Sequence, residues 1–328
     1  MLGIDVSKAT LACAYLDRTT ERFHWERSVP NTAAGVRELL QATPVDVPWI
    51  LEPTGPYSLP VVQQARAAGR IVLLAPPRQA KHYLGTLQTR AKTDRLDARG
   101  LACFAATRPK AEALRPYPVK SASVEHLDQL LAARRGITAA LTSLQQRSTA
   151  LPHAAAPLQA AVAGLQAQRQ ELDRQIAKLA GDREQFPHVT RLRQVTGIGP
   201  VIAAAVAARL TSHTFGTADQ FIAYIGLDVR VRRSGRRVGQ CGLTKQGDAE
   251  LRRLFYLAAQ ANTRCKSSPF KEQYQRELAK GLARPAALNA VARKLARVCW
   301  SLVKYGADYD PDQVHTPAPG KGRQWKGD

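Results

Sequence analysis

Short apolar segments alternate with amphipathic ones over residues 1–108, and this order constrains the fold more than any other feature of the 328-residue sequence. Short runs rich in β-branched and aromatic residues predict strands, whereas apolar residues at helical spacing predict helices. The predicted strands are residues 2–7, 11–17, 22–29, 47–52 and 70–75. The predicted helices are residues 32–42, with Asn31 as the N-cap, 57–69 and 93–106. The sequence therefore predicts three successive strands, followed by helix, strand, helix, strand and helix.

This order is that of a ribonuclease H-like α/β domain, but function depends on the chemistry of a site. Four acidic residues form a candidate site. Asp5 lies between apolar residues of the first predicted strand, where an unpaired charge is costly. Glu52 ends the fourth strand, and Asp94 and Asp97 are three residues apart, so on a helix they share one face. Carboxylates on rigid elements bind Mg²⁺, and two such ions support phosphodiester chemistry.

Each acid also has a purely structural interpretation. Asp94 can cap a helix, and Asp97 can pair with Arg95, Arg99 or Lys92 on a solvated face. Glu52 can be a loop charge. The joint pattern of a strand Asp, a strand-end Glu and a helical Asp pair favours metal binding.

A second region, residues 123–180, repeats apolar side chains every three to four positions. The repeat predicts two long helices joined by the proline-bounded turn "PHAAAP", which would pack as an antiparallel hairpin. The sequence leaves open whether this hairpin is an ordinary helical subdomain or a dimerising arm. The repeated residues are Leu130, Ile137, Leu144 and Leu151 in the first helix and Leu158, Val162, Leu165, Leu172, Ile176 and Leu179 in the second.

The sequence of residues 189–306 predicts a third, mostly helical unit. Its segment "VTGIGPVIAAAVAARL" has the shape of a helix-hairpin-helix, in which backbone N–H groups at Gly197 and Gly199 would approach a phosphate. The tail, residues 307–328, is rich in proline and glycine and is predicted to be disordered.

The charge balance indicates a polyanionic partner. The chain contains 48 Lys and Arg against 26 Asp and Glu, a net charge of +22, which favours nucleic acid. Five cysteines without a C-x-x-C pair indicate neither a disulfide framework nor a zinc site, and they fit a reducing cytoplasm. No apolar run approaches the roughly 18 residues of a membrane span, and no signal peptide is evident. We therefore expect a soluble, cytoplasmic protein with no membrane partner.

The segment "VRRSGRRVGQ" places the hydroxyl of Ser234 between two arginine pairs. Local composition favours Ser234 as a turn residue before Gly235, and the alternative is a nucleophile. Serine needs a base, a lowered pKa or a metal for activation, and the loop holds no histidine, so the carboxylate site would have to supply it. The surrounding basic residues, which predict a phosphate-binding surface, are Arg230, Arg232, Arg233, Arg236, Arg237, Lys245, Arg252 and Arg253.

Two other side chains compete with Ser234 as nucleophiles. Phosphodiester exchange through a thiol such as Cys241 is unusual, and Thr244 is expected to cap the next helix. Both therefore rank below Ser234. The tyrosines that could stack bases or lie in the core are Tyr57, Tyr83, Tyr224 and Tyr256, and Tyr224 is expected in the core.

Five segments together resemble the IS-one-ten family of insertion-sequence transposases. They occur in the family's order, and the likeness extends to about residue 305. Each motif is weak alone, whereas the set is highly specific. The segments are "GIDVSK" (3–8), "EPTGPY" (52–57), "KTDRLDA" (92–98), "TGIGPVIA" (196–203) and "SGRRVGQCGLTKQGDAELRRLFYLAA" (234–259).

The resemblance implies a RuvC-like domain at residues 1–108, a coiled-coil connector at 109–188 and a transposase domain at 189–306. In the first domain it implies an Asp-Glu-Asp-Asp site for Mg²⁺, with Mn²⁺ as an alternative. In the last domain it implies that Ser234 is the catalytic serine. The metal ligands that it implies are Asp5, Glu52, Asp94 and Asp97.

The resemblance also implies the partners. A structured bridge RNA would pair with donor and target DNA, and a homodimer would assemble into a tetramer in which the metal site of one subunit meets the serine of another. DNA strands would be exchanged through a covalent phosphoserine. Two alternatives are a junction-resolving, metal-dependent nuclease that uses water, and a non-catalytic nucleic-acid-binding scaffold.

Overall fold

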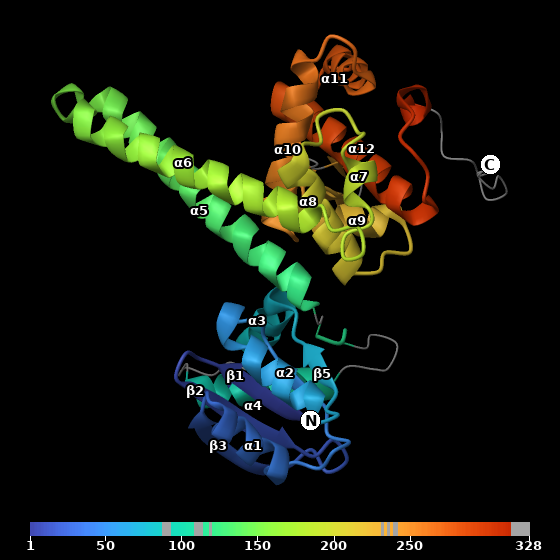
Figure 1. Ribbon diagram of the computed structural model, residues 1–328. Coiled ribbons are helices and arrows are strands. Elements are labelled where there is room, and N and C mark those ends of the chain that lie inside the picture. Colours follow the sequence, from blue (N-terminus) through green and yellow to red (C-terminus); the bar gives the residue numbers. More distant parts are fainter. Residues whose placement is uncertain are drawn as a thin grey trace. The chain divides into compact units, whose positions relative to one another are not determined.

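A computed structural model of the chain divides into two compact units, Met1–Val119 and Lys120–Asp328, each with its own hydrophobic core (Figure 1). The structure describes residues 1–86, 93–107, 114–117, 120–230, 233–234, 237–238 and 242–315.

Within the described part of the first unit, five strands form one mixed sheet in the order β3-β2-β1-β4-β5. The first three strands form an antiparallel meander, and β4 and β5 continue parallel to β1. Along the chain, the five strands follow one another in the predicted order. Their bounds are β1 Leu2–Val6, β2 Thr10–Leu16, β3 Phe23–Pro30, β4 Trp49–Leu51 and β5 Val72–Leu74.

Helices cover both faces of this sheet. Leu2, Ile4 and Val6 of β1 pack in one core with residues of α1 and α2. Because side chains alternate along a strand, Gly3 and Asp5 lie on the other face, which α4 covers. The helices are α1 Ala33–Ala42, α2 Leu59–Ala67, α3 Pro77–Thr86 and α4 Asp94–Ala106, with a 3-10 turn η1 at Gly55–Tyr57.

The sequence prediction was wrong in two details of this unit. Asn31 does not cap α1, because Thr32 occupies that position and its hydroxyl accepts a hydrogen bond from the N–H of Gly35 at 3.3 Å. Helix α3 was not predicted. Its buried residue is Ala80, so it lacks the apolar periodicity that reveals a helix in the sequence.

The second unit begins with two long helices, α5 (Ala122–Ala150) and α6 (Ala155–Ala180), which lie side by side in Figure 1. The predicted repeat is displaced on α5. Leu130 is half-buried and Leu151 is 52% exposed, whereas Leu127 and Leu131 are buried. The reason is that α5 packs against α6 and also against α8 (Pro200–Ser212), so its buried face lies between the two. A coiled coil stays a prediction.

The remaining helices of the second unit pack around one large core. Short two-residue strands interrupt them between α9 and α10. No helix in the described ranges is both long and apolar enough to cross a membrane. The helices are α7 Val189–Leu192, α9 Ala218–Ile225, α10 Ala249–Arg264, α11 Pro269–Ala279 and α12 Arg284–Tyr305. The strands are β6 Val229–Arg230, β7 Arg233–Ser234, β8 Arg237–Val238 and β9 Gly242–Leu243.

Candidate active site

Asp5 and Glu52 lie at the ends of neighbouring parallel strands. Ile4 of β1 is in register with Leu51 of β4, and each acid is the next residue along its chain. Adjacent strands are about 4.8 Å apart, so the backbones at the two acids lie side by side. Asp5 is still paired with Ala12 of β2, and both acids are half-buried.

Helix α4 brings the other two acids to the same face of the sheet. It begins at Asp94, where the Thr93 hydroxyl caps it by accepting from the Leu96 N–H at 3.3 Å. One turn later, Ala98 packs against Ala12 and Ala14 of β2. Asp97, which precedes Ala98, is half-buried, and Asp94 is exposed. The packing therefore sets the first turn of α4 near the strand that carries Asp5.

Gly3 permits this close packing. A Cβ atom at position 3 would lie 2.2 Å from the carbonyl oxygen of Ala98 and 2.6 Å from the backbone nitrogen of Ala102. Both neighbours are backbone atoms, so the helix as a whole would have to move. We expect Gly3→Ala to destabilise the chain by about 1–3 kcal/mol, the usual cost of overpacking, which urea unfolding curves would measure.

A matched control for Gly3→Ala is Gly85→Ala in α3, where nothing lies within 4 Å of the added Cβ. Its unfolding midpoint should be unchanged or slightly higher, because alanine favours a helix over glycine by up to about 1 kcal/mol. Equal midpoints for the two variants would contradict a tight contact between β1 and α4.

The four acids form a hard, all-oxygen donor set, which suits Mg²⁺ or Mn²⁺ better than zinc. Among the described residues, however, no group of three or more His, Cys, Asp or Glu side chains is close enough to hold an ion. The structure brings together the strand ends and the helix that carry the acids. It does not gather the four carboxylates around one point.

The arginines beside the helical acids have a partner that the sequence did not reveal. Arg95 and Arg99 both bind Glu26 of β3, at 2.5 Å and 3.0 Å. The Glu26 side chain is 9% exposed. These ion pairs fix α4 to the sheet, and they do not support the structural interpretation in which Asp97 pairs with these arginines. No local pattern could have indicated Glu26, because it lies about seventy positions away on another element.

Asn31, which the sequence analysis had assigned as a helix cap, has a different role. Its side-chain amide donates to the carbonyl oxygen of Ser7 at 2.8 Å and to that of Tyr57 at 3.2 Å. Ser7 follows β1 and Tyr57 belongs to the turn after Glu52. Asn31 therefore joins the two loops that leave the acid-bearing strand ends.

Ser234 lies in a short antiparallel ribbon. β6 pairs with β9, and β7 pairs with β8, with Ser234 in register with Arg237. Arg232, Arg236 and Cys241 lie outside the described residues, and for Arg233, Ser234 and Arg237 the structure describes the backbone alone. We call residues 228–244 the serine ribbon. At its base, the Thr244 N–H donates to the carbonyl oxygen of Asp228 at 3.0 Å, and the Thr244 hydroxyl binds the Asp228 carboxylate.

The prediction that Thr244 caps α10 was wrong, because Asp248 is the cap. One oxygen of its carboxylate accepts from the N–H of Glu250 at 3.0 Å and of Leu251 at 2.9 Å. Thr244 and Asp248 are both good capping residues, so local sequence could not choose between them.

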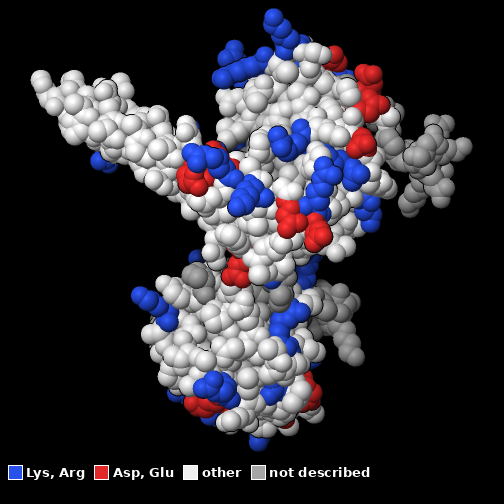
Figure 2. Space-filling view, viewed as in Figure 1, with Lys and Arg blue, Asp and Glu red and all other residues white. Residues whose placement is uncertain are grey.

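The described basic residues near the ribbon differ in exposure. Arg230 and Lys245 are exposed. Arg252 donates to the carbonyl oxygen of Ile225 at 2.9 Å, and Arg253 pairs with Glu250 at 2.6 Å. Both side chains therefore make contacts within the folded protein. Figure 2 shows Lys and Arg side chains on the visible faces of both units, where Asp and Glu side chains are fewer.

The tyrosines separate into core and surface residues. Tyr224 is in the core as expected, with its ring 5.2 Å from that of Phe215, and burial raises its pKa to about 12. Tyr83 packs edge-on against Phe104, and Tyr57 is 40% exposed. Of these three, Tyr57 is the most exposed, and base stacking by it stays a prediction.

The Gly-Ile-Gly turn is fixed against α10. Gly197 has a φ of +84°, and a Cβ there would lie 2.1 Å from the side-chain nitrogen of Asn262. That nitrogen donates to the carbonyl oxygens of Thr196 at 2.9 Å and Ala258 at 2.8 Å. The fold alone therefore requires glycine at 197. Phosphate binding by Gly197 and by Gly199, the N-cap of α8, stays a prediction.

Comparison with known proteins gives the family. A transposase family model matches residues 2–154, and a model of the transposase IS116/IS110/IS902 family matches residues 189–275. The "Probable family 20 transposase" of Pseudomonas aeruginosa is 31% identical over 288 residues, covering 76% of this chain and 82% of that protein. The chain belongs to the IS116/IS110/IS902 family of transposases. The first matched region of this transposase contains the four acids, and the second contains Ser234.

Two further comparisons are weaker. A 42 kDa protein of insertion element IS900 from Mycobacterium paratuberculosis is 23% identical to the transposase over 389 residues, covering 94% of this chain and 96% of that protein. The solved structure "T. thermophilus RuvC in complex with Holliday junction substrate" matches at 18% identity, covering 35% of this chain and 98% of that chain. Its TM-score of 0.29 supports no inference about this transposase.

Proposed function

We propose that this transposase breaks and rejoins the DNA strands of a mobile element and its target through a covalent phosphoserine at Ser234. Four carboxylates, those of Asp5, Glu52, Asp94 and Asp97, would hold Mg²⁺ for the reaction. Family membership carries the proposal. The side-by-side strand ends at Asp5 and Glu52, with the first turn of α4 on the same face of the sheet, support it.

In the proposed first step, the Ser234 oxygen attacks a phosphorus atom and a phosphorus–oxygen bond of the DNA strand breaks. A carboxylate accepts the serine proton, and the leaving deoxyribose oxygen takes up that proton to become a hydroxyl. A divalent ion held by the four acids would supply a Lewis acid for the phosphate oxygens. Arginines of the serine ribbon bind the phosphate and stabilise the charge that develops on it.

In the second step, the hydroxyl of another DNA end attacks the phosphoserine. The new phosphodiester forms as the bond to Ser234 breaks, and the serine recovers its proton. Because the covalent intermediate conserves the phosphodiester energy, exchange needs no ATP.

Recognition is proposed to be divided between RNA and protein. A structured bridge RNA would pair with donor and target DNA, while the protein reads phosphates and helix shape. The net charge of +22 fits such partners. Within the proposed division, residues 1–108 form a RuvC-like metal domain, 109–188 a coiled-coil connector and 189–306 the serine-bearing domain. A homodimer would assemble into a tetramer.

A covalent protein–DNA band is the expected result when the protein is incubated with Mg²⁺, labelled DNA carrying the element end, and RNA transcribed from the DNA beside the gene. The band should be absent when the RNA is left out. It would be resolved by denaturing electrophoresis before and after protease treatment.

The alternatives give different products in this experiment. Cleaved DNA without attached protein would favour a junction-resolving nuclease that uses water. Bound but intact DNA would favour a non-catalytic scaffold.

A further inference from the structure

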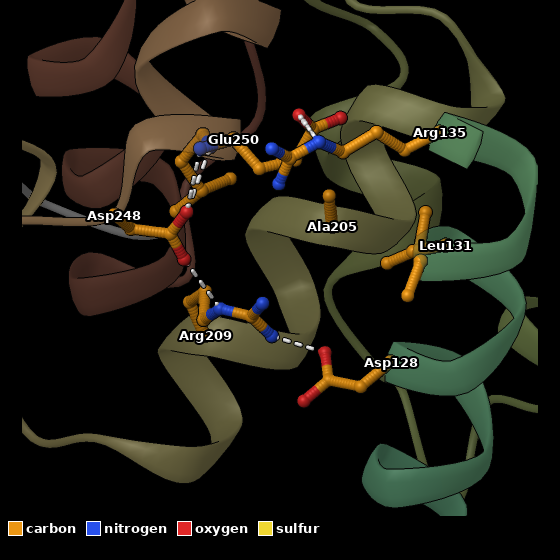
Figure 3. Close-up of a pocket in the computed structure, with 9 residues that line it drawn as sticks. Asp128, Leu131, Arg135, Ala205, Arg209, Asp248 and Glu250 are labelled. Atoms are coloured by element: carbon orange, nitrogen blue, oxygen red, sulfur yellow. Dashed lines mark hydrogen bonds and ion pairs between the residues drawn. The ribbon is translucent and has the colours of Figure 1, made fainter. Parts of the chain in front are cut away.

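Helices α5, α8 and α10 of the second unit meet around a small cavity of about 120 Å³, which both charged and apolar side chains line (Figure 3). Leu131 of α5 and Ala205 of α8 line its apolar side. Ion pairs cross it on both flanks. One flank is Arg135 of α5 with Glu250 of α10, whose nitrogen and oxygen are 3.6 Å apart. The other flank is built on Arg209.

Arg209 joins two carboxylates from distant parts of the chain. It stands in the last turn of α8, and its side chain is 17% exposed. Its Nε donates to Asp248 at 2.8 Å and its Nη1 donates to Asp128 of α5. Burial alone would lower the pKa of Arg209, but the two carboxylates outweigh it and raise that pKa above its ordinary value.

The two carboxylate oxygens of Asp248 accept hydrogen bonds from different partners. Oδ1 caps α10, while Oδ2 accepts from Arg209. Burial opposes the charge, but Arg209 and the capping N–H groups hold the pKa of Asp248 below its ordinary value. The carboxylate is therefore ionised and fixed at both oxygens at neutral pH.

The backbone around Asp248 closes the base of the serine ribbon. The Asp248 N–H donates to the carbonyl oxygen of Tyr224 at 2.9 Å. A Cβ at Gly247 would lie 2.1 Å from the same oxygen and 3.0 Å from the Gly226 nitrogen, so the two segments are in direct contact. The ribbon leaves α9 after Gly226 and enters α10 before Asp248. The cap residue thus fixes the point to which both ends of the ribbon return.

The ion pairs of Arg209 and Asp128 extend to the first residue of the second unit. Asp128 binds Arg209 with one oxygen and the ammonium group of Lys120 with the other. Lys120 is the first residue of this unit and directly follows the first unit in the sequence. Alternating charges therefore run from Lys120 through Asp128 and Arg209 to Asp248.

We propose that Arg209 is a positioning residue for Ser234, acting by fixing the base of the serine ribbon to helix α5 through Asp248 and Asp128. The inference rests on the proposed role of Ser234. Buried ion pairs add little net stability compared with apolar packing, and their best-attested use is to select one arrangement. A cavity between charge-bridged helices fits that use, since filled apolar contacts would fix the helices without any charge.

The test compares Asp128→Asn with Asp173→Asn in the full-length protein. Among the described residues, Asp128 makes no ion pair with the ribbon or with α10, and Arg209 is the residue that links it to Asp248. Asp173 of α6 is the matched control, because it pairs with Arg134 of α5 without contacting Arg209. Both variants keep side-chain size and remove one charge. Hydrogen exchange of the Asp248, Glu250 and Leu251 amides is measured first, which requires no catalysis.

We expect Asp128→Asn to speed exchange at these amides and to slow formation of the covalent protein–DNA band by about 10- to 100-fold, the usual cost of a misplaced reacting group. DNA and RNA binding should stay at the wild-type level. Arg209→Met should have at least the same effect, and Arg209→Lys should restore part of the rate because it keeps one charged contact.

The proposal is overturned if Asp128→Asn matches Asp173→Asn in either amide exchange or band formation. Failure of the proposed function is recognised separately. In that case wild-type protein forms no band, or Ser234→Ala forms as much as wild type, whatever the exchange data show.

Discussion

Replacing Ser234 by alanine is expected to abolish the covalent protein–DNA band and to lower strand exchange by at least about 10³-fold, as for other enzymes that lose a nucleophile. The alanine lacks the oxygen that would bond to phosphorus. Binding of RNA and DNA should change little, because the substitution removes one neutral hydroxyl and none of the charged side chains that bind phosphates. Exchange is measured with labelled donor and target DNA, and binding by gel shift.

Substitution of the competing nucleophiles serves as the control for Ser234→Ala. Cys241→Ser should exchange strands at nearly the wild-type rate. Thr244→Val should slow the reaction, because the Thr244 hydroxyl binds Asp228 at the ribbon base, but the DNA should still become linked to Ser234. Mapping of the linked peptide identifies the residue. A linkage to any other residue, or a band that persists in Ser234→Ala, would contradict the proposed mechanism.

The sequence predicted the architecture around the acids well because that architecture depends on local periodicity. Short apolar runs identified the strands, and the register of β1 with β4 then places Asp5 beside Glu52. The position of α4 against β1 also has a local cause. Gly3 and Ala98 are small residues, and their size permits close contact between the strand and the helix.

The caps and ion pairs could not be predicted because they depend on contacts between distant segments. Asn31 and Thr32 are both suitable caps for α1, and the contacts of Asn31 with Ser7 and Tyr57 decide which of them serves. Thr244 and Asp248 differ in the same way, since Arg209 and the backbone of α9 select Asp248.

Ion pairs between distant segments are even harder to predict from the sequence. Arg209 is separated from Asp248 by 39 positions and from Asp128 by 81. In a chain with 48 Lys and Arg, neither the arginine nor its partners stand out. The same holds for Glu26, whose pairing with Arg95 and Arg99 depends on α4 crossing the sheet. Such residues are found from the packed structure and then tested as positioning residues.

Asp5→Asn is expected to lower strand exchange by about 10²- to 10³-fold, corresponding to a loss of roughly 3–4 kcal/mol of transition-state stabilisation. The amide keeps the size of the side chain but carries no negative charge for a hard divalent cation. The concentration of Mg²⁺ or Mn²⁺ needed for half-maximal exchange should rise. The measurement is a metal titration of the exchange rate after treatment with a chelator.

The matched control for Asp5→Asn is Asp17→Asn at the opposite end of the same sheet. The carbonyl oxygen of Met1, directly before β1, accepts a hydrogen bond from the Leu16 N–H at 2.9 Å, so Asp17 lies beside the other end of the strand that carries Asp5. Asp17 accepts from the Thr19 N–H at 2.8 Å, and its loss should affect that turn without changing the metal requirement. If Asp5→Asn kept the wild-type rate and metal titration while Ser234→Ala was inactive, the ribbon would act without the carboxylates, and the proposed role of the acids would be wrong.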